Sequence, residues 1–291
     1  MNFDWQANWM TEEHLMFKES MRKFMEAEIA PNTDLWAEQG IVDREFWLKA
    51  GSAGLLGASA PTEFGGAGVD QSFDALTIYE QARVGDAGWG FGVHNICMHY
   101  ILGYGNDEQR SRWLPGLIAG EIIPAIAMTE PGTGSGLQAV KTTATADGDY
   151  YILNGSKIFI TNGQQADIVI VVAKTDKEAG ASGVSLIVLE ASEVTGFQRG
   201  RNLKKLGMKG QDTSELFFED VRVPRTNLLG QNEGRGFFQL MSQLGWERLV
   251  IGIGAIGAMD GMMGETIRYV KERKAFGQRL MDFQNTRFKL A

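Results

Sequence analysis

The first third of the chain carries apolar residues at helical spacing. After Thr11, whose hydroxyl suits an N-cap, apolar residues recur three and four positions apart until Pro31 ends the run. The same periodicity, interrupted by glycine-rich turns, predicts several further helices. These helices are expected at residues 44–50, 73–83, 89–102 and 106–118. Residues 1–121 are therefore expected to form an N-terminal helical domain.

The pattern changes to an alternation of apolar and polar residues after Gly120. Asp147-Gly148 and Asn154-Gly155 separate three alternating segments, which predicts a three-stranded meander because Asn-Gly is a strong hairpin signal. The predicted strands lie at residues 141–146, 150–153, 156–160, 168–174, 184–190 and 216–221. Residues 122–231 are expected to form a central antiparallel β-barrel-like domain.

The last part of the chain returns to helical spacing. One long helix is predicted from Phe237 to about Lys271, and a last helix begins near Asp282 and runs to Ala291 without a closing glycine or polar cap. One and a half helices cannot easily bury their own apolar face. Residues 232–291 are therefore expected to be a partial C-terminal helical bundle, and the whole chain an α+β multidomain protein.

Residues 252–257, Gly-Ile-Gly-Ala-Ile-Gly, match the dinucleotide-binding pattern GxGxxG. That pattern has meaning between a strand and a helix, with a second strand and an acidic residue further on. Here the following residues are basic and helical. We therefore expect small residues on a helix face, which let another helix or a ligand approach closely.

Composition narrows the possible functions. The hydrophobic content of 44% and charged content of 22% are ordinary for a soluble globular protein, and the net charge of −8 argues against a nucleic-acid partner. A single cysteine, Cys97, suits a reducing compartment. No apolar run reaches the roughly 18 residues of a membrane span, no targeting leader is evident, and the three histidines lack metal-site spacing. These features predict a cytoplasmic protein without a membrane span or metal site.

A glycine-rich turn at residues 126–135, Ile-Ala-Met-Thr-Glu-Pro-Gly-Thr-Gly-Ser, is the candidate ligand site. Its glycines let the backbone approach a ligand, and the hydroxyls of Thr129 and Ser135 add donors and acceptors. Such a turn can hold a flat, polar, phosphate-bearing molecule. An ordinary loop between two strands is the alternative interpretation.

Three motifs in this order resemble those of the acyl-CoA dehydrogenases. They are residues 128–135 (Met-Thr-Glu-Pro-Gly-Thr-Gly-Ser), residues 154–163 (Asn-Gly-Ser-Lys-Ile-Phe-Ile-Thr-Asn-Gly) and residues 273–277 (Arg-Lys-Ala-Phe-Gly). Residues 211–220 and 246–250 are most similar to the long-chain and isovaleryl branch. Members of the family continue for roughly another 90 residues, which complete a four-helix C-terminal domain, so the resemblance implies a C-terminally truncated chain.

The resemblance implies FAD bound between the β domain and the C-terminal helices, a fatty acyl-CoA substrate, electron-transfer flavoprotein as acceptor, and a homo-oligomer, usually a tetramer. The implied FAD-binding residues are Ile126, Met128, Thr129, Gly134, Ser135, Phe159, Ile160, Thr161, Arg273, Phe276 and Gln284. Arg273 and Gln284 match positions that reach the FAD of a neighbouring subunit. The implied substrate-binding residues are Ser135, Ser182, Phe238, Gly245, Trp246 and Arg248.

Glu247 is the candidate base for the reaction that the resemblance implies, α,β-dehydrogenation to trans-2-enoyl-CoA with hydride transfer to the flavin. Residues three and four positions away, Gln243, Leu244, Val250 and Ile251, offer it no cation. Burial without a charged partner would raise its pKa and make it a stronger base. An exposed helix carboxylate is the alternative. Arg248 lies about 100° further around the helix and need not neutralise it.

Two other classes of function remain open from the sequence. An acyl-CoA oxidase would pass its electrons to oxygen and release peroxide. A non-catalytic fragment or binding module would lack the flavin and purify colourless.

Overall fold

The computed structural model describes residues 6–85 and 88–291. Its α-helices are α1 (Glu12–Glu28), α2 (Thr33–Gln39), α3 (Arg44–Ser52), α4 (Gln71–Arg83), α5 (Phe91–Tyr104), α6 (Asp107–Ala119), α7 (Gly236–Glu272) and α8 (Gln284–Leu290). Its strands are β1 (Pro124–Ala127), β2 (Thr143–Asp147), β3 (Tyr150–Thr161), β4 (Ile168–Lys174), β5 (Val184–Glu190), β6 (Phe197–Asn202), β7 (Thr213–Pro224), β8 (Lys274–Ala275) and β9 (Gln278–Arg279). The α+β architecture expected from the sequence is confirmed.

The described chain packs as two compact units, each considered by itself below. One unit contains α1, the part of α4 from Ala75 onward, and the chain from Val250 onward. The other contains residues 32–74 and 88–249, and therefore the whole seven-stranded sheet.

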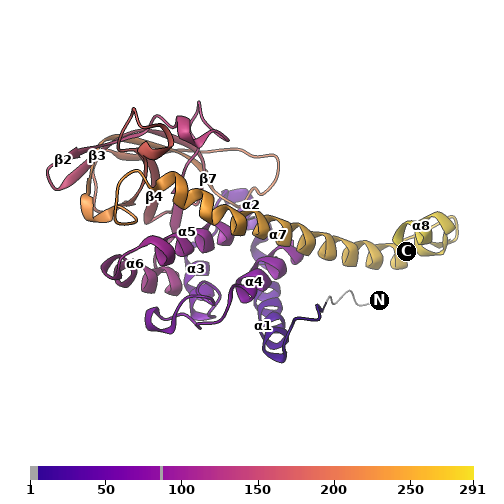
Figure 1. Ribbon diagram of the computed structural model, residues 1–291. Helices are drawn as coiled ribbons and strands as arrows, with labels where there is room; N and C mark the ends of the chain where they lie inside the picture. The colour runs from indigo at the N-terminus through magenta and orange to yellow at the C-terminus, as the bar shows by residue number, and fades with distance from the viewer. Residues whose placement is uncertain (1–5, 86–87) are drawn as a thin grey trace. The chain divides into compact units, whose positions relative to one another are not determined.

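The sheet has the strand order β1-β4-β2-β3-β7-β6, with β5 paired to β4. Strands β2, β3, β4 and β7 of this sheet are labelled in Figure 1. The sequences of strands β4 and β5 are mostly apolar, because both faces of each strand are buried. Alternate residues of β4 serve two cores: Ile168 and Ile170 pack in one, and Val169 and Val171 in the other. The first of these cores joins the sheet to α5 and α6.

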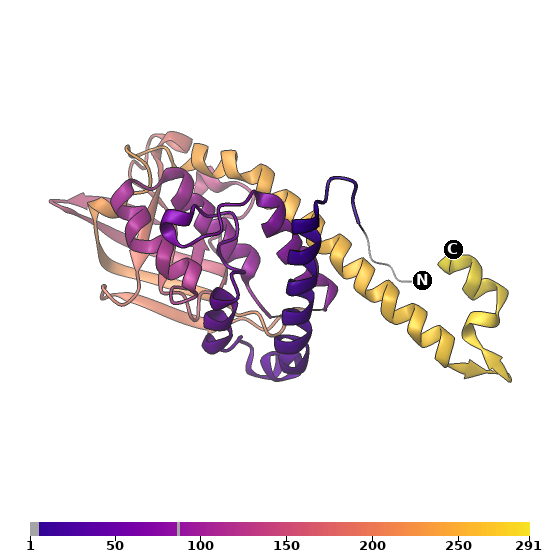
Figure 2. The same ribbon diagram turned by 90° about the horizontal axis from the view of Figure 1, so that it is seen from below.

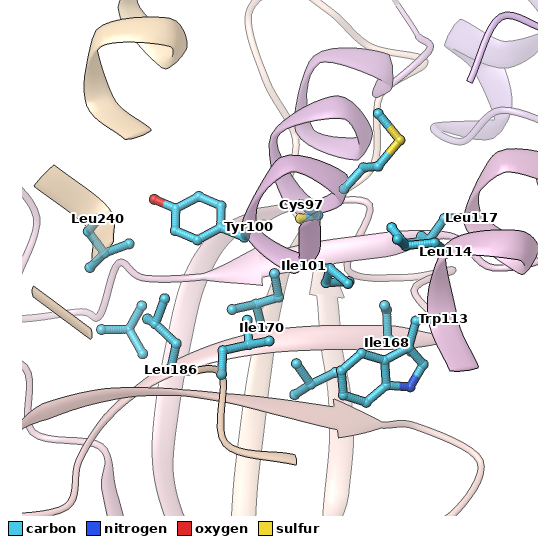
Figure 3. Packing of buried hydrophobic residues seen from close by; sticks show 14 of the residues in the cluster. Cys97, Tyr100, Ile101, Trp113, Leu114, Leu117, Ile168, Ile170, Leu186 and Leu240 are labelled. Carbon is cyan, nitrogen blue, oxygen red and sulfur yellow. The ribbon is translucent and has the colours of Figure 1, made fainter. Parts of the chain in front are cut away.

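Figure 3 shows that core at close range. Helix α5 contributes Cys97 and Ile101, α6 contributes Trp113, and the sheet contributes Ile168 and Leu186, all of them buried. Burial of each large apolar side chain stabilises the fold by about 1.5–3 kcal/mol, so this core fixes α5 against the sheet. A rigid α5 matters because it carries two side chains of the candidate site.

Two predictions about the sheet are wrong in detail. Asn154-Gly155 does not form a hairpin but a bulge within the continuous strand β3, where Gly155 has φ +153° and the register with β7 shifts. The side chain of Asn154 donates to Asp220 Oδ1 and accepts from its backbone N–H, both at 3.0 Å, which ties the bulge to β7. The sheet is also mixed and not purely antiparallel, because β1 pairs parallel with β4 across a long connection.

The part of helix α7 from Val250 onward packs closely against the part of α4 from Ala75 onward, within one compact unit. A Cβ atom on Gly257 would lie 2.3 Å from the carbonyl oxygen of Tyr79, and one on Gly261 would lie 2.1 Å from that of Arg83. The tyrosine hydroxyl also donates a hydrogen bond to Asp260. Residues 252–257 lie inside this helix, so the dinucleotide interpretation is excluded, and the expectation of a small residue at a close helix contact is confirmed at Gly257.

Alanine at Gly257 should therefore destabilise the protein. We expect the free energy of unfolding to fall by about 1–3 kcal/mol, because the added methyl group meets backbone that cannot rotate away. Gly252→Ala is the matched control: nothing lies within 4 Å of its added carbon, and a helix interior gains about 1 kcal/mol from glycine to alanine. Urea unfolding measures both, and equal changes would contradict the close contact.

The same unit ends in the hairpin β8–β9 and helix α8, which follow α7 along the chain (Figure 2). Among the described residues, α7 is the one helix that is long and apolar enough to cross a membrane, by length and composition alone. Length and composition alone are weak grounds for a span, since core helices of soluble proteins pass the same test.

Candidate active site

The glycine-rich turn is anchored by a buried ion pair. Lys157 Nζ donates to Glu130 Oε1 at 2.9 Å, to the Met128 carbonyl at 3.0 Å and to the Val172 carbonyl at 2.7 Å. Both charged side chains are buried. Lysine is tolerated inside a protein only when its donors are used in this way. The pair therefore fixes the start of the turn to strands β3 and β4.

Glu130 has further donors that keep it ionised. The backbone N–H groups of Lys141 and Thr142 donate to its carboxylate at 2.7 and 2.9 Å. Burial by itself would raise the pKa of Glu130, but the hydrogen bonds and the ammonium of Lys157 hold that pKa below its usual value. Burial lowers the pKa of Lys157 to about 8, and Glu130 opposes this change.

A bulge in β3 places an exposed aromatic ring beside the turn. The Ile158 N–H donates to the Thr129 carbonyl at 2.9 Å, and the register with β7 shifts between Lys157 and Ile160. At the bulge, Phe159 adopts φ +62° and its side chain is 63% exposed. A bulky residue in the left-handed region is strained, and such strain often marks a ligand site.

These two segments, which are separate motifs in the sequence, fit the ring and phosphates of a flavin. The exposed face of Phe159 suits a flat apolar partner. Added carbons at Gly132, Gly134 and Gly136 would meet nothing within 4 Å, so the turn is open to a large polar group. Nearby, Ser135 is exposed and its hydroxyl is accessible.

The remaining predicted cofactor residues of this unit border the turn and the bulge. Ile126 lies in β1, and Met128 and Thr129 follow it, all three half-buried. Ile160 is buried in the sheet and Thr161 is half-buried at the end of β3. The fold thus places all five on β1, β3 or the turn.

Glu247 lies on α7, half-buried against α5. The Tyr100 hydroxyl donates to Glu247 Oε1 at 2.8 Å. Burial raises the pKa of Glu247, while the Tyr100 hydrogen bond and the nearby Arg248 oppose the rise. Among the described residues, no lysine, arginine or histidine forms an ion pair with it. The carboxylate therefore has the raised pKa that the sequence predicted.

Helix α5 also contacts Trp246, which precedes Glu247 on α7. The Trp246 indole N–H donates to Asn95 Oδ1 at 2.9 Å, and its ring meets His99 edge to face at 6.1 Å. Sequence reasoning missed both Asn95 and Tyr100 as site residues. The sequence feature that could have indicated them is the presence of polar side chains in an otherwise apolar helix.

Four further predicted substrate residues lie at the surface of the same unit. Phe238 is 47% exposed, with the Arg235 guanidinium 4.9 Å from its ring centre. Gly245 and Arg248 are exposed on α7, and Ser182 is exposed before β5. No hydrogen bond within the described chain joins these side chains to Glu247 or Ser135.

Arg273, Phe276 and Gln284 belong to the other compact unit, and all three are exposed. Phe276 is 95% exposed with φ +53°, at the tip of the β8–β9 hairpin, and its ring meets Phe283 edge to face at 6.4 Å. An exposed aromatic residue in a strained turn is available to a partner.

Comparison with known proteins places the chain in a family. Models of the N-terminal, middle and C-terminal domains of acyl-CoA dehydrogenases match residues 11–121, 125–221 and 234–291. The isovaleryl-CoA dehydrogenase of Pongo abelii is 39% identical over 290 residues, which cover 98% of this chain and 68% of the relative. The chain belongs to the acyl-CoA dehydrogenase family.

The branch resemblance is supported by a second relative. The long-chain specific acyl-CoA dehydrogenase of Sus scrofa is 49% identical over 282 residues, which cover 96% of this chain and 65% of the relative. The chain thus spans slightly less than two thirds of the length of that acyl-CoA dehydrogenase. Both relatives are described as mitochondrial, and the cytoplasmic location expected from the sequence stays a prediction.

Solved structures share the fold. The acyl-CoA dehydrogenase of Geobacillus kaustophilus is 47% identical with a TM-score of 0.94, over 98% of this chain and 75% of that one. A glutaryl-CoA dehydrogenase of Mycobacterium smegmatis in complex with FADH2 is 31% identical with a TM-score of 0.88, over 97% and 71%. A structure described as the electron transferring flavoprotein of Acidaminococcus fermentans is 37% identical with a TM-score of 0.93, over 98% and 75%. Acyl-CoA dehydrogenases are FAD-dependent.

Proposed function

We propose that the chain oxidises a fatty acyl-CoA to its trans-2-enoyl-CoA with bound FAD and with Glu247 as the base. The observation that carries this proposal is a half-buried carboxylate whose pKa burial raises, and which forms no ion pair within 4 Å among the described residues. A carboxylate in those surroundings is a stronger base than one in water. Family membership supplies the reaction class.

The turn and the bulge are the proposed holders of FAD in this unit. Thr129 and Ser135 offer hydroxyls, the glycines of the turn offer backbone N–H groups, and Phe159 offers a flat apolar surface. When bound, FAD supplies the acceptor for the hydrogen that leaves the β carbon. The Glu130–Lys157 pair keeps the turn in place before any ligand arrives.

Glu247 would take the proton from the carbon next to the thioester. A neutral thioester is a very weak carbon acid, so the base must be positioned and largely freed of water. The Tyr100 hydrogen bond fixes the position of the carboxylate. Burial destabilises the ionised form and raises the pKa of Glu247, which makes the carboxylate a stronger base. The exposed Arg248 is proposed to contact the CoA moiety.

Trp246 is proposed to line the acyl pocket, because Asn95 and His99 hold its ring against α5, the helix whose Tyr100 also contacts Glu247. Trp246→Ala should change the ratio of kcat/KM between short and long acyl-CoA substrates by roughly 10-fold or more, because one methylene in an apolar pocket already changes such a ratio by about 10-fold and the indole is larger. Trp9→Ala, an exposed tryptophan in the other unit, is the control. An unchanged ratio in Trp246→Ala would exclude it from the pocket.

The acceptor and the assembly follow from the same proposal. Electron-transfer flavoprotein is the proposed acceptor, supported by the similarity to a structure so described. A homo-oligomer, and specifically a tetramer, is proposed because Arg273 and Gln284 are exposed and match positions that reach a neighbouring subunit's cofactor.

The test of function is product formation by the 291-residue chain reconstituted with FAD. Octanoyl-CoA and palmitoyl-CoA are supplied with a dye acceptor, and the enoyl-CoA product is identified by mass spectrometry. Enoyl-CoA formation that requires the dye supports a dehydrogenase. Peroxide release in air without the dye would indicate an oxidase, and no product under either condition would overturn the proposal.

A further inference from the structure

We propose that Tyr100 is a positioning residue for the base: its hydroxyl holds Glu247 Oε1, so that the other carboxylate oxygen, Oε2, receives the α proton of the substrate. This inference rests on the proposed function and names a residue that the sequence motifs do not contain. It concerns one hydrogen bond between α5 and α7, which joins two residues, Tyr100 and Glu247, that lie 147 positions apart in the chain.

The tyrosine is placed rigidly enough to orient a carboxylate. Its side chain is fully buried in the core that also contains Cys97 and Ile101. In Figure 3 the Tyr100 ring extends from α5 and its oxygen points away from that helix. The ring is therefore held by packing while the hydroxyl group faces away from α5. The bond of 2.8 Å to Glu247 Oε1 has the length expected for a hydroxyl donor.

The two oxygens of Glu247 therefore differ. Oε1 accepts the Tyr100 hydrogen bond, whereas no donor to Oε2 occurs in the part of the chain that the structure describes. In the proposed step the Cα–H bond of the substrate breaks, an O–H bond forms at Oε2, and the electron pair stays on the substrate, spread toward the thioester carbonyl. Tyr100 keeps its proton throughout, because burial and the adjacent carboxylate raise the pKa of its hydroxyl.

The same hydrogen bond moderates the basicity of Glu247. The groups that face the carboxylate are Tyr100 and Cys97 from α5 and Arg248 from α7 itself. Burial raises the pKa of the Cys97 thiol, which stays neutral, so Tyr100 is the close donor that favours the ionised form. Loss of the hydroxyl should raise the pKa of Glu247 further and leave less of the active base at neutral pH.

Tyr100→Phe tests this role, and Tyr104→Phe is the matched control. Tyr104 lies one turn along the same helix and donates to the Gln239 carbonyl at 3.2 Å, so the control loses a tyrosine hydroxyl bond without touching the base. In Tyr100→Phe, the midpoint of the rising limb of kcat/KM against pH should move upward by about one pH unit, which lowers kcat/KM about tenfold below that midpoint. Tyr104→Phe should leave the midpoint unchanged.

A readout without turnover separates this inference from the proposed function. Carboxyl-carbon NMR of the chain with isotopically labelled glutamate, with the Glu247 signal identified by its loss in Glu247→Gln, gives the Glu247 pKa directly. An upward change in Tyr100→Phe alone supports the inference even if the wild type forms no enoyl-CoA, an outcome that would overturn only the proposed function. An unchanged Glu247 midpoint in Tyr100→Phe, or an equal change in Tyr104→Phe, overturns the inference.

Discussion

Glu247→Gln should lower kcat by about 10²–10⁴-fold, the range that general acid–base catalysis contributes. Glutamine has nearly the same shape, and its amide oxygen can still accept the Tyr100 hydrogen bond, but it cannot take a proton from carbon. Glu265→Gln is the control, because Glu265 is an exposed carboxylate further along α7 that pairs with Arg268. Steady-state turnover with saturating acyl-CoA measures both variants.

The pH dependence of kcat/KM should carry the signature of the same group. The base works only in its ionised form, and burial raises its pKa above the usual carboxylate value. Activity should therefore rise with pH through that raised pKa and be lost as the pH falls below it. A rising limb centred at the pKa of an exposed glutamate, or none at all, would show that another group accepts the proton.

Lys157→Met should reduce the free energy of unfolding by about 3–5 kcal/mol, the cost of leaving one charge of a buried pair without its partner. The ammonium of Lys157 serves Glu130 and two backbone carbonyls, and methionine replaces none of these donors. The carboxylate of Glu130 would keep its two backbone N–H donors but lose its counter-charge. Urea unfolding followed by far-UV circular dichroism measures the loss.

Two further variants isolate the buried pair. Lys141→Met removes an exposed lysine that lies close to Glu130 in sequence, and its effect should stay within about 0.5 kcal/mol. Glu130→Gln combined with Lys157→Met removes both charges and should be less destabilised than Lys157→Met alone. If Lys141→Met cost as much as Lys157→Met, the buried pair would not be the source of the stability.

The sequence predicted local features well where one physical cause dominates. Strands β4 and β5 match the predicted ranges because they are short apolar runs, buried on both faces and bounded by turn residues. Helix α7 matches within one residue at each end. Strand β6 was missed because Phe197–Asn202 is polar and largely unburied, which resembles a loop.

The bulge at Asn154-Gly155 shows where local reasoning fails. Asn-Gly permits a tight hairpin turn, but the same freedom permits a bulge with φ +153° at Gly155. The choice is made by β7, which pairs with β3 on both sides of the bulge, and by the Asn154–Asp220 hydrogen bonds. Such partners are distant in sequence and cannot be read from a local pattern.

The candidate site likewise contains one feature that the sequence could predict and others that it could not. The raised pKa of Glu247 could be predicted because its own helix offers no cation at the right spacing. Its partner Tyr100 could not, because 147 positions separate the two residues. The buried contact of Lys157 with Glu130 was likewise hidden, since a lysine in a strand ordinarily faces water.

The most direct test of Glu247 as the base is a single anaerobic experiment. Wild type and Glu247→Gln are reconstituted with FAD, mixed with acyl-CoA without oxygen, and followed through the visible flavin absorption. We expect rapid bleaching in the wild type and almost none in Glu247→Gln, with both proteins binding FAD equally. Equal bleaching in the two proteins would contradict the assignment of the base, and a wild type that binds FAD but does not bleach would contradict the proposed reaction.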